Sequence, residues 1–217
     1  MNELKEILKF YRDMGAEFLH LPESDPRAEL AELNRAILRC RQCRLHETKT
    51  NYVPGEGSQR PDIIFIGEGP GQTEDQFGRP FIGNAGQLLD KIIQKMGYRR
   101  EDVFIGNVVK CRPPNNREPL PDEVDACLPF LRRQIELLRP QVIVCLGKVA
   151  LNNLLGTNHS MGRIRGQRLQ FNHIPLIPTY HPSYILHKKE KEEISRTKRE
   201  VWDDMQSVLA IIAEKRH

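Results

Sequence analysis

Four consecutive apolar residues, Ile63-Ile64-Phe65-Ile66, run directly into the turn Gly67-Glu68-Gly69-Pro70-Gly71. An apolar run of this length, rich in β-branched side chains, predicts a strand buried on both faces, as in a parallel sheet. The glycines and the proline end that strand in a tight turn, where another molecule can approach the backbone. Ligands of open α/β sheets bind at the carboxyl ends of strands, so Glu68 lies where a ligand is expected. The alternative is a purely structural turn with a solvated Glu68.

Further strands and helices alternate along the chain after this turn. Strands are predicted at residues 103–109, 142–146 and 174–177, and helices at residues 85–96, 121–138, 148–155 and 201–213. Segments 72–83 and 112–121 are predicted as loops, and segment 48–61 as a loop that can hold a short strand. The mixed-charge run 188–199 is predicted as a solvated helix face. The alternation indicates an α/β fold, a three-layer α/β/α sandwich around a short, mainly parallel four-stranded sheet.

Residues 1–38 are predicted as an N-terminal helical extension. Apolar residues recur at helical spacing in residues 1–21 and again in residues 27–38, with a proline-containing break at 22–26. Residues 39–217 then form a single domain, and we expect the extension to lie on it near the cysteines described below.

The bulk composition fits one domain with a real core: 217 residues, 39% hydrophobic and 29% charged. The formal net charge of +4 permits a polyanionic partner without requiring one. No apolar run approaches the length of a membrane span, and the N-terminus has no signal-peptide pattern. We therefore expect a cytoplasmic or nucleoid-associated protein that does not bind membranes and acts as a monomer.

Four of the five cysteines have positions that suit metal binding. Cys40 and Cys43 form a C-x-x-C pair, Cys111 follows the second strand, and Cys127 lies in the first turns of the next helix. Disulfides are rare in the cytoplasm, where spaced cysteines more often bind metal. Four thiolates suit zinc or an iron–sulfur cluster, and spacing does not decide between them. The alternative is four unrelated thiols. Cys145 lies in an apolar strand and is expected to be a small buried hydrophobe. Neighbouring cations would offset the negative charge of a thiolate centre: Arg39, Arg41, Arg44, Lys110 and Arg112.

Polar side chains lie at three strand ends: Glu68 after the first strand, Asn107 in the second and His181 after the fourth. Asn107 offers a donor and an acceptor together, which suits the edge of a base or an amide. His181 offers a donor or a positive charge that can stabilise an oxyanion. Phe81 is an aromatic residue in a loop and is available for stacking on a planar ligand. Taken singly, each also fits a turn residue, a surface histidine or a core plug. The glycines of the central turn partly imitate a dinucleotide-binding pattern, but the last glycine is missing.

Taken together, these residues resemble the motifs of a known family, the type-4 uracil-DNA glycosylases, which are iron–sulfur enzymes of bacteria and archaea. The matching segments are, in chain order, Gly67-Glu68-Gly69-Pro70-Gly71, Gly78-Arg79-Pro80-Phe81-Ile82-Gly83, Asn107-Val108-Val109-Lys110-Cys111-Arg112-Pro113-Pro114 and His181-Pro182-Ser183-Tyr184. The likeness runs from about residue 39 to the C-terminal helix, and residues 1–38 inherit nothing from it.

The resemblance implies a four-iron, four-sulfur cluster (4Fe-4S) with a structural role. Its ligands would be the four cysteines at the family's cluster positions: Cys40, Cys43, Cys111 and Cys127. The resemblance also implies a DNA-repair enzyme that flips uracil out of DNA and hydrolyses its N-glycosidic bond, leaving an abasic site. Uracil-containing DNA would then be the substrate, and free uracil a product.

The resemblance further assigns roles in the base pocket. Phe81 would stack on uracil, and Asn107 would bond its polar edge and so exclude cytosine. His181 would hydrogen-bond uracil O2, where negative charge grows as the bond breaks, a contribution on the order of 3 kcal/mol. The turn after the first strand would contact the base through Glu68, Gly69 and Pro70.

Two departures from related families bear on the mechanism. Some relatives place a water-positioning aspartate where this chain has Gly69. Glu68 is therefore the first candidate to assist the attacking water, with Glu74 or Asp75 next, unless leaving-group stabilisation provides most of the catalysis. A related branch that traps uracil covalently has a basic, histidine-bearing insertion after the second strand. This chain has no histidine in residues 115–119, so turnover is predicted.

The segment after His181 is predicted to be the loop that enters the DNA minor groove. Ser183 would contact a phosphate, and one of Tyr184, Ile185 and Leu186 would wedge into the vacated stack. Four basic residues are predicted to contact backbone phosphates of the DNA: Lys148, Arg163, Arg165 and Arg168. The alternative is that they form a solvated basic surface.

Two other functions compete with the glycosylase interpretation. One is a metal-containing nucleic-acid-binding module without catalysis, which would have no need of the combined set Glu68, Phe81, Asn107 and His181. The other is an α/β enzyme acting on a free base or nucleotide, which the basic residues disfavour.

Overall fold

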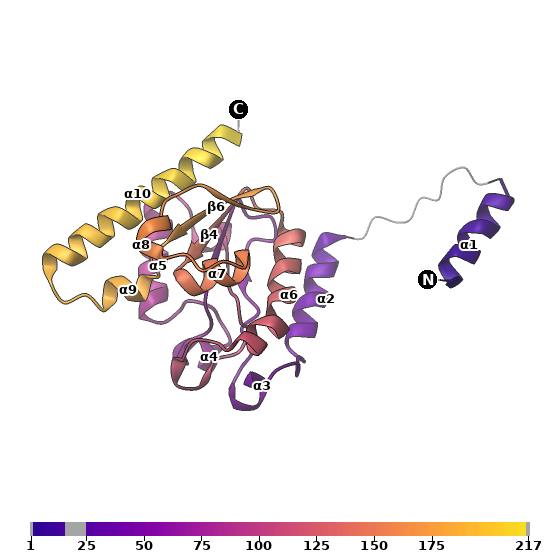
Figure 1. Ribbon diagram of the computed structural model, residues 1–217, viewed down its shortest axis with the longest axis horizontal. Coiled ribbons are helices and arrows are strands. Elements are labelled where there is room, and N and C mark those ends of the chain that lie inside the picture. Colours follow the sequence, from indigo (N-terminus) through magenta and orange to yellow (C-terminus); the bar gives the residue numbers. More distant parts are fainter. Residues whose placement is uncertain (1, 16–24, 216–217) are drawn as a thin grey trace.

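The computed structural model describes residues 2–15 and 25–215 (Figure 1). The strands are β1 (Glu56–Gly57), β2 (Ile63–Gly67), β3 (Phe104–Asn107), β4 (Val142–Leu146), β5 (Leu169–Phe171) and β6 (Ile174–Thr179). The helices are α1 (Asn2–Asp13), α2 (Pro26–Ile37), α3 (Leu45–Thr48), α4 (Gln72–Phe77), α5 (Asn84–Lys95), α6 (Pro121–Leu138), α7 (Lys148–Leu155), α8 (Met161–Ile164), α9 (Pro182–Leu186) and α10 (Lys191–Lys215). Among them, no helix is long and apolar enough to cross a membrane.

The strands form one mixed sheet in the order β1-β3-β2-β4-β6-β5. The inner strands β3, β2, β4 and β6 are parallel, while β1 and β5 pair antiparallel at the two edges. The predicted α/β fold is confirmed, but the predicted number of strands was wrong, because the sheet has six strands and not four. The two additional strands are only two and three residues long, too short to produce a recognisable alternation in the sequence.

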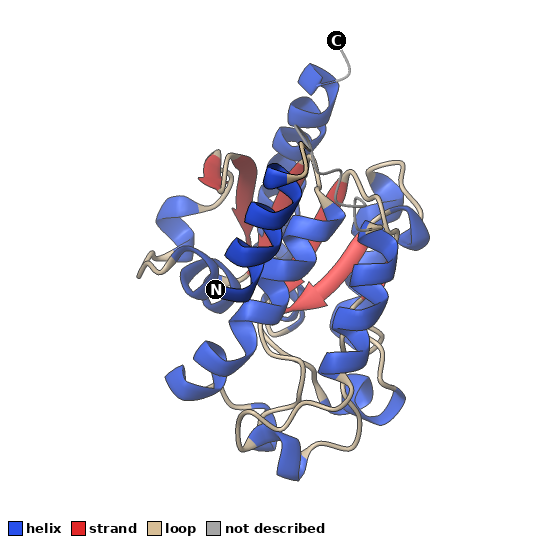
Figure 2. Ribbon diagram, turned by 90° about the vertical axis from the view of Figure 1, so that its right-hand side faces the viewer, coloured by secondary structure: helices blue, strands red, loops and turns tan. Residues whose placement is uncertain are grey.

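Alternate residues of the inner strands face two separate cores. In β2, Ile64 and Ile66 pack into a core shared with α2, α6 and α7, whereas Ile63 and Phe65 pack into one shared with α5 and α10. This period of two is what a strand covered on both faces requires. Figure 2 shows the strands enclosed between helices, as in a three-layer sandwich.

Two segments are more helical than the sequence predicted, and two predicted helical stretches are joined. Segment 72–83, predicted as a loop, contains α4, which has acidic residues in its first turn and ends at the left-handed Gly78. The predicted loop after His181 is the short helix α9, with Pro182 at its first position. The two C-terminal stretches form one continuous helix, α10.

The second half of the N-terminal extension is part of the packed structure. Leu30 of α2 is buried in the same core as α6, Ile37 is also buried, and Glu29 pairs with Arg133 of α6. Residues 16–24, which include the end of the first predicted helical stretch, lie outside the described residues. The division into an extension and a single domain stays a prediction.

Candidate active site and cysteine pocket

A cavity of about 770 Å³ lies at the carboxyl ends of the parallel strands β2, β3, β4 and β6. Ser183 and Tyr184 from α9 and Lys148 from α7 contribute to its wall. Its lining also includes all six residues that the sequence predicted to bind a base: Glu68, Gly69, Pro70, Phe81, Asn107 and His181. The parallel sheet thus brings residues from distant parts of the sequence to one site.

Gly67, the last residue of β2, lets two of these side chains come together. It pairs in parallel register with Asn107 at the end of β3. A Cβ atom on Gly67 would lie 2.5 Å from Asn107 Oδ1 and 2.5 Å from Phe81 Cζ, closer than real Cβ contacts allow. The amide and the aromatic ring therefore both pack directly against the Gly67 backbone.

Asn107 carries an unpaired polar atom in a buried place. Its side chain is 1% exposed, and its Oδ1 has no hydrogen-bond partner among the described residues. A buried polar atom without a partner costs about 1–3 kcal/mol. Because Asn107 lines the cavity, this amide is suited to accept a hydrogen bond from a ligand.

His181 is held as a neutral ring with a defined tautomer. Its Nδ1 accepts a hydrogen bond from the Ser183 backbone N–H at 3.2 Å and lies 2.7 Å from Ser183 Oγ. Burial lowers the pKa of His181 to about 4, so the ring is neutral near pH 7. Because Nδ1 is an acceptor, the single ring proton lies on Nε2 and is available to a ligand. The Phe81 ring centroid lies 5.6 Å from that of His181.

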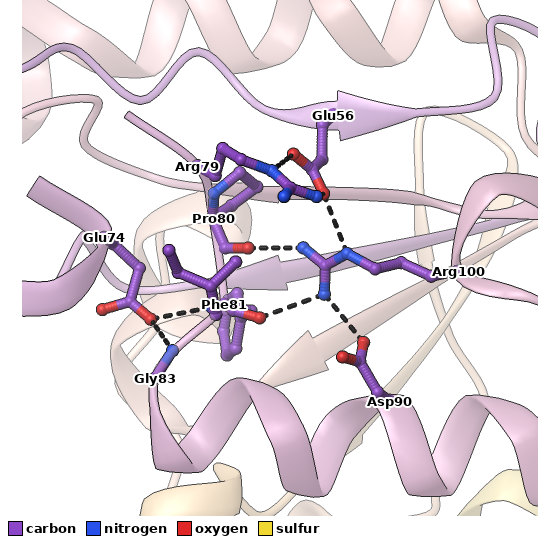
Figure 3. Close-up of polar contacts among 9 residues, drawn as sticks. Glu56, Glu74, Arg79, Pro80, Phe81, Gly83, Asp90 and Arg100 are labelled. Atoms are coloured by element: carbon purple, nitrogen blue, oxygen red, sulfur yellow. Dashed lines mark hydrogen bonds and ion pairs between the residues drawn. The ribbon is translucent and has the colours of Figure 1, made fainter. Parts of the chain in front are cut away.

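Arg100 binds the main chain of the Phe81 segment (Figure 3). The Phe81 backbone is left-handed, with φ of 50°, which is costly for a non-glycine residue. Arg100 donates hydrogen bonds to the carbonyl oxygens of Phe81 (3.0 Å) and Pro80 (2.5 Å). It also pairs with Glu56 at 2.8 Å and Asp90 at 2.7 Å. Sequence reasoning missed this role, because Arg99 and Arg100 are adjacent and no local signal distinguishes them.

Glu74 holds the same segment from the other side. Its Oε1 accepts hydrogen bonds from the backbone N–H groups of Ile82 (2.9 Å) and Gly83 (2.8 Å), as Figure 3 shows. The carboxylate of the buried Asp75 likewise accepts hydrogen bonds from the backbone N–H groups of Thr50 and Asn51. Glu74 and Asp75, the reserve candidates for assisting water, therefore both bind backbone amides.

Glu68 is the cavity carboxylate with a raised pKa. Burial, and secondarily the charge of Glu118, raise the pKa of Glu68 to about 7, while Lys148 opposes the rise. Lys148 Nζ and Glu118 Oε1 form an ion pair at 3.0 Å, and both residues line the cavity. Gly69 beside it has no room for a side chain, since a Cβ atom would lie 2.7 Å from Val109 Cγ2.

The residues predicted to contact DNA lie in different environments. Tyr184 and Leu186 of α9 are exposed, at 42% and 49%, whereas Ile185 is buried at 3%. Arg163 is exposed. Arg165 instead pairs with the buried Asp204 at 2.7 Å, and Arg168 pairs with Glu214.

A second, smaller pocket is lined by all four of the cysteines predicted to bind metal: Cys40, Cys43, Cys111 and Cys127. The Lys110 backbone N–H donates to Cys127 Sγ at 3.2 Å, and the Tyr52 hydroxyl donates to the Cys40 carbonyl oxygen at 2.6 Å. Burial, reinforced by the neighbouring cysteines, raises the pKa of Cys111 to about 12 and that of Cys127 to about 11. A bound metal would have to displace these protons. Cys145 is fully buried in β4, apart from this pocket.

No group of three or more His, Cys, Asp or Glu side chains in the described part of the chain is arranged to hold a metal ion. The four thiols nevertheless share one pocket, and a four-thiolate set suits an iron–sulfur cluster or zinc.

Comparison with known proteins agrees with this geometry. A model of the uracil DNA glycosylase superfamily matches residues 54–206. The type-4 uracil-DNA glycosylase of Thermotoga maritima is 44% identical over 192 residues, covering 87% of this chain and 98% of that protein. The type-4 enzyme of Archaeoglobus fulgidus is 45% identical over 76% of this chain and 86% of that protein. A type-5 uracil-DNA glycosylase of Pyrobaculum aerophilum is 30% identical over 60% of this chain and 65% of that protein.

The Arg100 contacts generate a testable prediction about the Phe81 segment. Arg100→Met leaves two main-chain carbonyls unpaired, at about 1–3 kcal/mol each. We expect a lower free energy of unfolding in urea and faster hydrogen exchange at the amides of Ile82 and Gly83. The matched control is Arg99→Met, because Arg99 is exposed and its ion pairs contribute no more than about 1 kcal/mol. Equal effects of the two substitutions would contradict the assignment.

Proposed function

Because the chain belongs to the type-4 branch of the uracil-DNA glycosylase superfamily, we propose that it removes uracil from DNA by hydrolysing the N-glycosidic bond. The substrate is a uracil nucleotide flipped out of DNA into the cavity at the strand ends, as enzymes that act on a base require. The products are free uracil and an abasic site in the DNA.

The observation that carries this proposal is the unpaired, buried Oδ1 of Asn107. Uracil presents an N–H donor at N3 next to an acceptor at O4, which complements the acceptor and donor of an Asn amide. Cytosine presents an acceptor at N3 and donors at N4, so it leaves the same amide mismatched. A site with buried polar groups rejects a ligand that leaves them unpaired. Phe81, packed beside Asn107 at Gly67, provides the aromatic surface for the ring.

His181 stabilises the leaving group. When the bond between C1′ and N1 breaks, its electron pair moves into the uracil ring and charge grows on O2. The Nε2–H of the neutral imidazole donates to that oxygen, while Ser183 holds Nδ1 as an acceptor. One well-placed donor of this kind contributes about 3–4 kcal/mol to lowering the barrier.

Glu68 assists the attacking water. The water oxygen forms a bond to C1′ as uracil departs, and its proton passes to the Glu68 carboxylate. A base is most effective when its pKa lies near the working pH, which agrees with the raised pKa of Glu68, about 7. With Gly69 offering no side chain, Glu68 is the carboxylate of the β2 turn that faces the cavity.

Cys40, Cys43, Cys111 and Cys127 would hold the four-iron, four-sulfur cluster. The soft thiolate set and the shared pocket support this group. When bound, the cluster supplies a cross-link between three segments of the chain. These segments are the turn after α2, the segment that follows β3 and the second turn of α6.

DNA binds at the mouth of the cavity, along α9. Ser183 contacts a phosphate, and exposed Tyr184 or Leu186 enters the space left by the flipped base. Burial of Ile185 against the protein disfavours it as the wedge. Arg163 and Lys148 are exposed and therefore able to reach the DNA backbone, unlike Arg165 in its internal ion pair.

The test is an excision assay on oligonucleotides with one uracil, single- and double-stranded, without added metal or nucleotide, followed by alkaline cleavage at abasic sites. We expect cleavage at the uracil position and none at cytosine. His181→Ala is expected to lower the single-turnover rate roughly 100- to 1000-fold. His173→Asn, in an exposed turn, is the matched control and should excise at the wild-type rate. No cleavage by cluster-loaded wild-type protein would refute the proposed function.

The pKa of Glu68 generates a prediction for the pH profile. Below its pKa the carboxyl group is protonated and cannot accept a proton, so the single-turnover rate should rise through about pH 7 and then level off. Glu68→Gln should remove this rise and lower the rate roughly 100- to 10,000-fold. Glu118→Gln removes a negative charge that raises this pKa, so it should move the rise to lower pH. The same pH rise in Glu68→Gln would exclude Glu68 as the base.

A further inference from the structure

Lys110 is a fully buried lysine between the base cavity and the cysteine pocket. Its side chain is 1% exposed, and it precedes Cys111 directly. Burying an ammonium group is costly unless its hydrogen bonds are satisfied, and lysine is among the residues least often buried. The sequence predicted that it offsets the charge of a thiolate centre, and its ammonium group also makes hydrogen bonds to groups other than the cysteines.

The ammonium group of Lys110 binds the main chain of the base-reading residue. Its Nζ donates to the carbonyl oxygen of Asn107 at 2.8 Å and to Oε1 of Gln134 at 2.7 Å. Gln134, fully buried in α6, donates in turn to the carbonyl oxygen of Pro54 at 2.9 Å. The ammonium group is therefore anchored to α6, two turns beyond Cys127.

The backbone of Lys110 is fixed at the cysteine pocket. Its N–H donates to Cys127 Sγ at 3.2 Å, and its carbonyl oxygen accepts from the Val53 N–H at 2.8 Å. Between Lys110 and Asn107, the N–H groups of Val108 and Val109 bond the carbonyl oxygens of the β2 turn, at Gly67 and Glu68. One short segment thus joins the cysteine pocket to two walls of the base cavity.

We propose that Lys110 is a positioning residue that couples the cysteine pocket to the base cavity by fixing the main chain of Asn107. This inference rests on the proposed function for its catalytic consequence. Without the ammonium group, the carbonyl of Asn107 loses the hydrogen bond from Lys110, and with it the link through Lys110 to Gln134 of α6. The Asn107 amide then loses its fixed place beside Phe81, and catalytic steps are sensitive to displacements of about 1 Å.

The test compares Lys110→Met, which keeps most of the length of the side chain and removes its charge, with wild type. We expect a single-turnover excision rate lowered roughly tenfold or more per iron-loaded chain. We also expect weaker inhibition by free uracil and faster hydrogen exchange at the amides of Val108 and Val109. Gln134→Met, which removes the anchor on α6 but retains the lysine, should show the same pattern more weakly and serves if Lys110→Met does not fold.

The control is Lys49→Met, because Lys49 lies over the Tyr52 ring near the cysteine pocket and is not among the residues that line the base cavity. It should keep the wild-type rate and iron content. Two results would overturn the proposal: wild-type rates in both Lys110→Met and Gln134→Met, or a loss of rate wholly accounted for by loss of iron. If wild-type protein excises no uracil, the proposed function fails, while the exchange of the Val108 and Val109 amides still tests the coupling.

Discussion

The base cavity depends on a close approach of three chain segments at Gly67. Parallel pairing places Asn107 beside this glycine, and the left-handed Phe81 segment brings an aromatic ring against it from another side. Any side chain at this position would occupy the space of both. The strand therefore has to end in glycine, and the cavity that results has one aromatic wall and one amide wall meeting at a bare backbone.

Two cations, the half-buried Arg100 and the buried Lys110, hold these walls from outside the cavity. Arg100 binds the carbonyls of the Phe81 segment, and Lys110 binds the carbonyl of Asn107. Neither side chain is among those that line the cavity. Each instead donates hydrogen bonds to main-chain oxygens of one wall, Arg100 to those of Pro80 and Phe81 and Lys110 to that of Asn107. The reactive groups Glu68 and His181 are thus placed on a frame whose rigidity comes from charged hydrogen bonds as well as from the packed cores.

The sequence predicts what is local and periodic. The parallel strands are continuous apolar runs, so the fold was accessible from pattern, whereas the set of base-binding residues at the strand ends came from the family resemblance. The two edge strands lack enough residues to show a pattern. The role of Arg100 depends on Glu56 and Asp90, and that of Lys110 on Gln134, and these partners are adjacent only after folding. The burial of Ile185 likewise depends on helix packing that no local signal reports.

The measurement that tests this account most directly is the binding of free uracil and the excision rate of Gly67→Ala. The added methyl group would displace the Phe81 ring, the Asn107 amide or both, so uracil binding should be lost and excision should fall roughly 100-fold in a protein that still folds. Gly162→Ala is the control, because Gly162 also lines the cavity but its methyl group would meet nothing within 4 Å outside its own helix backbone and chain neighbours. Wild-type uracil affinity and wild-type excision by Gly67→Ala would contradict the account.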